Sequence, residues 1–261
     1  MVHGMPIDYA RRLTGTVRTK RENTHLGVGL AFVAGATNAG AFLAVSQYTS
    51  HMTGIVSSMA DALVLGQTGV FLTGVGALCA FMLGATTTAI MVNYARRRGL
   101  ASAFALPLLL EAALLLVFGF LGARLQLIHS LFVPAAVSLL CYLMGLQNAV
   151  ITKISKAEIR TTHVTGIVTD IGLELGKLLY SNRTKIAGEP PVMADRARLA
   201  LLAMLLAAFF SGGVIGALGF RAIGYSATIP LALVLLILAV VPAVDDVRRA
   251  IIEERGSDGQ H

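Results

Sequence analysis

The sequence has few of the features of a soluble protein. Only 13% of its 261 residues are charged, against roughly 25% in ordinary soluble domains. Hydrophobic residues make up 56% of the chain, and the mean hydropathy is +0.75. A chain with so little charge and so many apolar residues is expected to lie in a lipid bilayer.

Tryptophan and cysteine are scarce as well. There is no tryptophan, and the two cysteines, Cys79 and Cys141, both lie in apolar stretches. A thiol in such surroundings behaves as a small apolar residue. Two isolated cysteines exclude a disulfide framework and a CxxC metal or redox pair.

Motifs of catalysis and of nucleic-acid binding are also missing. The chain has no His-Glu-x-x-His motif, no Gly-x-Ser-x-Gly motif and no recognisable Ser-His-Asp set. We therefore expect no enzymatic activity and no cofactor. The net charge of +7 comes from short basic clusters at the ends of apolar stretches, which indicates membrane orientation and not a nucleic-acid partner.

Six apolar stretches of about 20 residues are each long enough to cross a hydrocarbon core of roughly 30 Å. They cover residues 26–47, 69–95, 104–123, 132–152, 199–220 and 226–244. The sequence thus predicts an all-α integral membrane protein with six transmembrane helices.

An internal repeat relates the two halves of the chain. Gly35-Ala36-Thr37-Asn38-Ala39 is echoed by Gly145-Leu146-Gln147-Asn148-Ala149, and His51-Met52-Thr53-Gly54-Ile55-Val56 by His163-Val164-Thr165-Gly166-Ile167-Val168. Two matches in the same order predict two copies of one structural unit. We expect a first membrane repeat over residues 26–125 and a second over 126–249, flanked by a cytoplasmic basic segment over 1–25 and a cytoplasmic tail over 250–261.

Each half carries a shorter and less apolar segment, over residues 52–66 and 164–179. With six spans only, 19 of the 21 Lys and Arg residues lie on one side, as the positive-inside rule requires. If the short segments also crossed, Arg96, Arg97 and Arg98 would lie on the wrong face. The sequence therefore predicts that these segments are re-entrant or interfacial helices and that both termini are cytoplasmic.

Three crossings per repeat place the second copy in the membrane upside down relative to the first. Inverted repeats are typical of transporters, whose half-helices bring their N-terminal ends to a solute or ion. Thr53 and Thr165 are expected to cap the two short helices, and Gly54 and Gly166 to allow close approach of the backbone.

The segment Ser50-His51-Met52-Thr53-Gly54, which follows a Gly-x-x-Asn span, resembles the signature of the YoaK-type bacterial inner-membrane proteins. The resemblance covers residues 25 to 245. That family has no established substrate, so the resemblance implies a bacterial inner-membrane location and a fold of six or seven spans, but no activity.

Polar residues shared by the repeats are the first candidates for a binding site. His51 and His163 invite a metal interpretation, but two histidines without a third ligand make a poor cage, so no metal is expected. They are better candidates for lining a pathway. Asn38 and Asn148 lie at span depth, where an amide either bridges helices or faces a cavity.

Glu111 lies alone in the apolar run from Leu106 to Phe118. A charge at the bilayer centre costs about 2.5 to 3.5 kcal/mol, so protonation, a partner such as His51 or Asn38, or a water-filled pathway must stabilise it. The second repeat has Val234 at the equivalent place.

The sequence predicts a small-solute or ion transporter whose pathway lies between the two His-x-Thr-Gly segments. Its candidate binding residues are Asn38, His51, Thr53, Gly54, Glu111, Asn148, His163, Thr165 and Gly166. A passive channel and a membrane interaction protein remain alternatives, and the sequence leaves open whether the chain forms a homo-oligomer.

Overall fold

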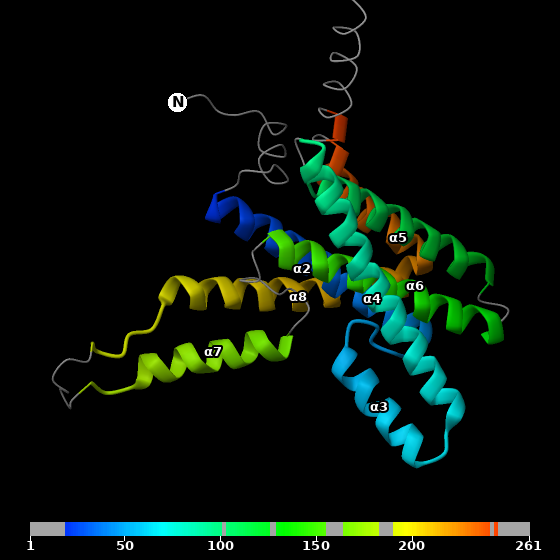
Figure 1. Ribbon diagram of the computed structural model, residues 1–261, viewed down its shortest axis with the longest axis horizontal. Helices are drawn as coiled ribbons and strands as arrows, with labels where there is room; N and C mark the ends of the chain where they lie inside the picture. The colour runs from blue at the N-terminus through cyan, green and yellow to red at the C-terminus, as the bar shows by residue number, and fades with distance from the viewer. Residues whose placement is uncertain are drawn as a thin grey trace, which may run out of the picture.

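The computed structural model describes residues 19–100, 103–125, 129–154, 164–182, 190–240 and 243–244. All regular secondary structure in these ranges is helical (Figure 1). The elements are α2 (Lys20–Val45), α3 (Met52–Val64), α4 (Thr68–Arg97), α5 (Ala105–Leu125), α6 (His129–Ile154), α7 (Val164–Leu179), α8 (Arg196–Ile223), the short 3-10 helix η1 (Gly224–Ala227) and a helical segment over residues 228–240.

Five helical stretches of the described chain are long and apolar enough to cross a membrane. Four of them are α2, α4, α5 and α6, which coincide with the first four predicted spans. The fifth runs over 45 residues, Arg196–Val240, and contains both α8 and residues 228–240. It covers the last two predicted spans, and η1 interrupts it between them.

Local interactions explain where the helices begin and end. Thr19 and Glu22 form a capping box at the start of α2, and Ser46 ends that helix with a left-handed φ of 54°. The Asp195 carboxylate accepts the backbone N–H of Arg198 and caps α8. Gly224, with φ +60°, ends α8 in a conformation that side chains disfavour.

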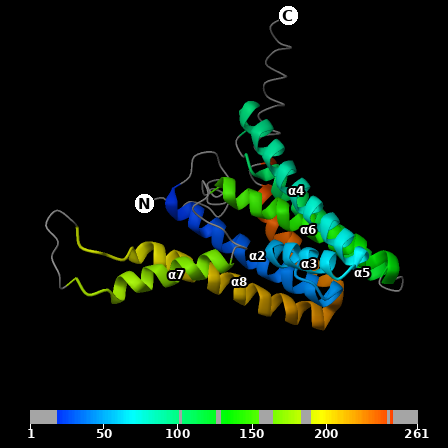
Figure 2. The ribbon, with the colours of Figure 1, turned by 60° about the horizontal axis from the view of Figure 1, so that its bottom comes forward.

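The long helices pack in two close pairs, α2 with α8 and α4 with α6 (Figures 1 and 2). In the first pair, a Cβ atom on Gly35 would strike the carbonyl oxygen of Phe209, and one on Gly212 would strike that of Phe32. Each helix therefore presents a glycine to the backbone of its partner. Such small-residue contacts let helices approach closely in membranes.

The second pair repeats this arrangement. A Cβ atom on Gly84 of α4 would strike the carbonyl oxygen of Tyr142, and one on Gly145 of α6 would strike that of Phe81. Buried Thr88 adds a hydrogen bond of 2.9 Å to the carbonyl oxygen of Leu146. Because Gly35 and Gly145 are equivalent in the sequence repeat, the same kind of contact occurs once for each half of the chain.

The two short helices lie beside the following long ones, α3 along α4 and α7 along α8. Both start near the middle of the molecule and run outward from it (Figures 1 and 2). Their bounds agree with the predicted short segments. The predicted caps are wrong, because α3 begins at Met52 with His51 as its N-cap and α7 begins at Val164. Thr53 and Thr165 lie within the first turns.

Large apolar side chains cover the outer faces of the long helices. Leu72 and Leu83 on α4, Phe120 on α5 and Phe210 on α8 are each more than half exposed. In water such a surface would promote association. Against lipid it is the expected exterior of a membrane protein.

Candidate functional site

A pocket of about 520 Å³ lies where the two short helices begin. Its lining comes from α2 and the turn after it, from the first turns of α3 and α7, and from α4, α6 and α8. The residues are Asn38, Tyr48, Ser50, His51, Met52, Thr53, Phe81, Asn148, Val164, Thr165, Gly166 and Phe209.

The pocket draws equivalent residues from both halves of the chain. The sequence repeat relates Asn38 to Asn148, Met52 to Val164 and Thr53 to Thr165, and all six of these residues line the pocket. Phe81 and Phe209, whose carbonyl groups contact Gly145 and Gly35, add one aromatic ring from each half. The lining is thus close to two-fold symmetric in its residues.

Six of the nine predicted site residues line this pocket, and two of the other three, Gly54 and Glu111, do not. Asn38, His51, Thr53, Asn148, Thr165 and Gly166 are brought together. Gly54 lies next to them in the first turn of α3, and Glu111 is not part of the lining. His163 lies outside the described residues.

Asn38 is 8% exposed, and its Oδ1 atom accepts a hydrogen bond of 3.0 Å from the hydroxyl of Ser50. This contact ties α2 to the turn that leads into α3. The Nδ2 atom of Asn38 has no hydrogen-bond partner among the described residues. Its amide group therefore offers an unused donor at the pocket. Asn148, its equivalent on α6, is also 8% exposed.

His51 is exposed, and its side chain makes no capping hydrogen bond to the N-terminus of α3. Its imidazole packs over Gly54, where a Cβ atom would lie only 2.5 Å from Nδ1. Gly54 thus gives room to the imidazole. Gly54 and Gly166 were predicted to allow close approach of another backbone segment. The neighbour of Gly54 is instead the His51 side chain, and a Cβ atom on Gly166 would have no atom within 4 Å.

A second pocket of about 770 Å³ adjoins the first and shares Tyr48 and His51 with it. It lies between the end of α2, α3 and the start of α4. Its polar lining residues are Ser46, Gln47, Tyr48, His51, Ser58 and Thr73. Tyr48, stacked on Phe42 at a centroid distance of 4.7 Å, and His51 thus separate two adjoining pockets.

Glu111 is fully buried on α5. Neither of its carboxyl oxygens has a hydrogen-bond partner among the described residues. The sequence suggested His51 or Asn38 as partners, but Asn38 accepts from Ser50 instead. The predicted need for stabilisation is therefore not met by either of these two side chains.

A polar network joins α7 to the start of α8. Glu174 accepts hydrogen bonds from Nζ of Lys177 at 2.7 Å and from the backbone N–H of Asp195 at 2.8 Å. Arg198 forms an ion pair of 3.0 Å with Asp170. The hydrogen bond from Lys177, followed by that from Asp195, lowers the pKa of the Glu174 carboxyl below its usual value.

Residues 26–241 match the family described as proteins of unknown function, DUF1275. The chain belongs to the DUF1275 family. This is the family of the YoaK-type proteins, which the Ser-His-Met-Thr-Gly segment resembles. No curated protein and no solved structure matches the chain. The DUF1275 match includes every residue that lines the two adjoining pockets.

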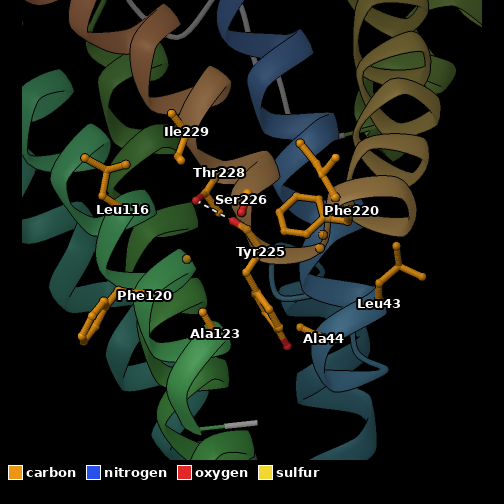
Figure 3. Close-up of a pocket in the computed structure, with 14 residues that line it drawn as sticks. Leu43, Ala44, Leu116, Phe120, Ala123, Phe220, Tyr225, Ser226, Thr228 and Ile229 are labelled. Carbon is orange, nitrogen blue, oxygen red and sulfur yellow. Dashed lines mark hydrogen bonds between the residues drawn. The ribbon is translucent and has the colours of Figure 1, made fainter.

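This DUF1275 chain has a third pocket, of about 730 Å³, between the ends of α2 and α5 and the η1 turn. Figure 3 shows Phe220 of α8 and Tyr225 of η1 among the residues that line it. The hydroxyl of Thr228 donates a 2.9 Å hydrogen bond to the carbonyl oxygen of Tyr225. No candidate residue from the sequence lies in this largely apolar lining.

The sequence did not predict some of the residues that line the first pocket of this DUF1275 chain. Phe81 and Phe209 are apolar residues in apolar spans, so composition does not single them out. The glycines three residues later, Gly84 and Gly212, extend the repeat and would have paired these phenylalanines. Among the described residues, no group of three His, Cys, Asp or Glu side chains could hold a metal ion.

Proposed function

We propose that this chain transports a small solute or ion through a pathway between α3 and α7. The observation that carries the proposal is the pocket at the start of both short helices, which residues from the two halves line in equivalent pairs. In transporters built from repeats, half-helices often have one end at a binding site near the middle of the membrane.

The proposed architecture has six spans in two inverted repeats. The stretch Arg196–Val240 contains 45 residues, so a continuous helix would be about 68 Å long. That length is about twice the hydrocarbon core. Because η1 interrupts this stretch, we propose that the chain turns there and that residues 228–240 form the sixth span. The duplicated glycine contacts of α2 with α8 and of α4 with α6 support the repeat.

We place the chain in the bacterial inner membrane with both termini cytoplasmic. The distribution of Lys and Arg supports this orientation, because only Arg124 and Arg221 then lie outside. The third pocket lies near both of these residues in sequence and would face the periplasm. The proposed role needs no enzymatic chemistry, and besides the lipid bilayer its partner is the transported solute.

The adjoining second pocket favours a route through the protein. Solute passing from it to the first pocket would move past Tyr48 and His51, which line both. A passive channel would use the same route without alternating access. An interaction protein would not need two adjoining pockets.

Flux into proteoliposomes tests the proposal. The purified chain is reconstituted, and uptake of small anions, cations and neutral solutes is followed over a range of concentrations. Uptake that saturates supports a carrier, and uptake that rises linearly supports a channel. A folded protein that moves none of these solutes would overturn both and leave the interaction role.

A further inference from the structure

The described residues that line the first pocket present hydrogen-bond donors and no carboxylate. None of its described lining residues is Asp, Glu, Lys or Arg. Among the described residues, the polar lining has two amides, four hydroxyl groups and one imidazole. A metal or organic cation would find no carboxylate in this lining, so the chemistry points away from a cationic ligand.

The start of α3 is open at this pocket. His51, its N-cap, makes no side-chain hydrogen bond to the helix. The first α-helical bond runs from the N–H of Ile55 to the carbonyl of His51. The N–H groups of Thr53 and Gly54 therefore precede the regular ladder and are available to a ligand. Val164, Thr165 and Gly166 form the corresponding first turn of α7 at the same pocket.

Asn38 gives a second and independent indication of a ligand. Its side chain is more than nine-tenths buried, lines the pocket and keeps an amide Nδ2 without a partner among the described residues. An acceptor bound in the pocket would supply the hydrogen bond that this donor lacks.

The dipoles of α3 and α7 indicate the charge of the ligand. The N-terminus of a helix acts as about half a positive elementary charge. Two such ends at one pocket amount to about one positive charge, which a monovalent anion would balance. The rings of Phe81 and Phe209 and the side chain of Met52 add apolar walls for a short hydrocarbon body.

We propose that the pocket between the starts of α3 and α7 binds a small monovalent organic anion, namely a short-chain carboxylate. The carboxylate accepts hydrogen bonds from Asn38 and from the first-turn N–H groups of α3 and α7, and its apolar body lies against Phe81 and Phe209. This assignment rests on the proposed transport function and names the class of its substrate.

Three solutes of the same shape and different charge test the assignment. The thermal stability of the purified chain is measured at pH 7 with sodium butyrate, butyramide or butylammonium chloride, at constant ionic strength set with sodium chloride. Butyrate is expected to raise the melting temperature in a saturable manner, because a ligand that binds only the folded state stabilises it. Butyramide and butylammonium are expected to leave it unchanged.

Asn38→Asp is the matched variant. It keeps an acceptor for the Ser50 hydroxyl but replaces the free amide donor with a negative oxygen. The apparent dissociation constant for butyrate should rise at least tenfold. The control is Asn93→Asp, the same exchange at an exposed position on α4, which should bind butyrate like the parent. The comparison of the three solutes on the parent needs no variant, so it holds even if Asn38→Asp does not fold.

The possible outcomes separate this assignment from the transport function. Stabilisation by butylammonium or butyramide but not by butyrate would overturn the anion assignment and retain a solute site. No stabilisation by any of the three would also overturn it. The transport function itself falls if the proteoliposome assay shows no flux of any solute.

Discussion

Glu111 places a carboxyl group in the apolar interior of α5. The side chain is fully buried, and neither oxygen has a hydrogen-bond partner among the described residues. A charge at the centre of a bilayer is unfavourable by about 2.5 to 3.5 kcal/mol even on the most lenient scale. The residue is therefore kept at a cost in stability unless it stays neutral.

Glu111→Gln is expected to leave the melting temperature at pH 7 unchanged or to raise it, because glutamine keeps the size of the side chain and cannot be charged. Thermal unfolding in detergent measures this. Stabilisation by butyrate should persist, because Glu111 does not line the pocket. A loss of several degrees in the melting temperature would show that the carboxylate has a stabilising partner in the folded protein.

The site residues that the sequence could predict are polar residues that occur in both halves. Asn38 and Asn148 stand out because an amide in an apolar span is costly, and they do line one pocket. The position of Thr53 within α3 was not predictable in this way. Turn bonds from His51 to Tyr48 and from Met52 to Ser50 bring the helix start forward to Met52, so the hydroxyl that favours an N-cap lies inside the helix.

At the scale of the helices, glycine contacts decide how closely the long elements pack. Gly84 and Gly76 lie on the same helix, α4, but only Gly84 faces the backbone of α6. We expect Gly84→Ala to destabilise the protein by about 1 to 3 kcal/mol through overpacking. Gly76→Ala has open space around it, and should be neutral or stabilise the helix by up to about 1 kcal/mol. Thermal unfolding of both variants measures the difference.

The repeat predicts that Gly212→Ala behaves like Gly84→Ala, because each glycine faces the carbonyl group of the partner helix. Equal stability of the Gly84→Ala and Gly76→Ala variants would contradict the tight packing of α4 on α6.

The contact of α7 with α8 depends on pH through Glu174. The pKa of its carboxyl is lowered in the folded protein, so its contribution to stability is present above the unfolded pKa of about 4.3. That contribution is lost as the pH falls through the folded pKa. The difference in melting temperature between the parent and Glu174→Gln should therefore be positive at pH 7 and shrink toward zero in acid.

A series of melting curves from pH 7 to pH 3.5 measures this difference. Asp61→Asn on α3 is the control, since Asp61 has no side-chain partner among the described residues, and its difference from the parent should stay small throughout. A difference for Glu174→Gln that grows as the pH falls would contradict the assigned network.

The sequence predicted the bounds of the helices far better than it predicted which helices pack together. Length and hydropathy placed the long helices within a few residues, and shorter length with reduced hydropathy marked the two short ones. Which helices pack against each other could not be predicted from the sequence in the same way. Gly35 stands in the sequence repeat, but only the three-dimensional arrangement shows that residues 35–36 face residues 209–216.

At the scale of the whole molecule, the proposed orientation puts the end of α4 in the cytoplasm and the end of α5 in the periplasm. We expect an Arg97→Cys variant to react with an impermeant thiol reagent only from the cytoplasmic side. An Arg124→Cys variant should react from the periplasmic side. Both are made with Cys79 and Cys141 replaced by alanine. Labelling of the Arg97→Cys variant from the periplasm would overturn the inverted repeats.

The most direct test of the account asks whether the starts of α3 and α7 lie at one water-filled pocket within the membrane. Thr53→Cys and Thr165→Cys variants without native cysteines are treated, in sealed membranes, with a negatively charged thiosulfonate applied to each side in turn. Both should react, whereas Leu83→Cys, at a 60% exposed position on the outer face of α4, should not. If Thr53→Cys and Thr165→Cys resist labelling while Arg97→Cys reacts, no solute pathway runs between these helices.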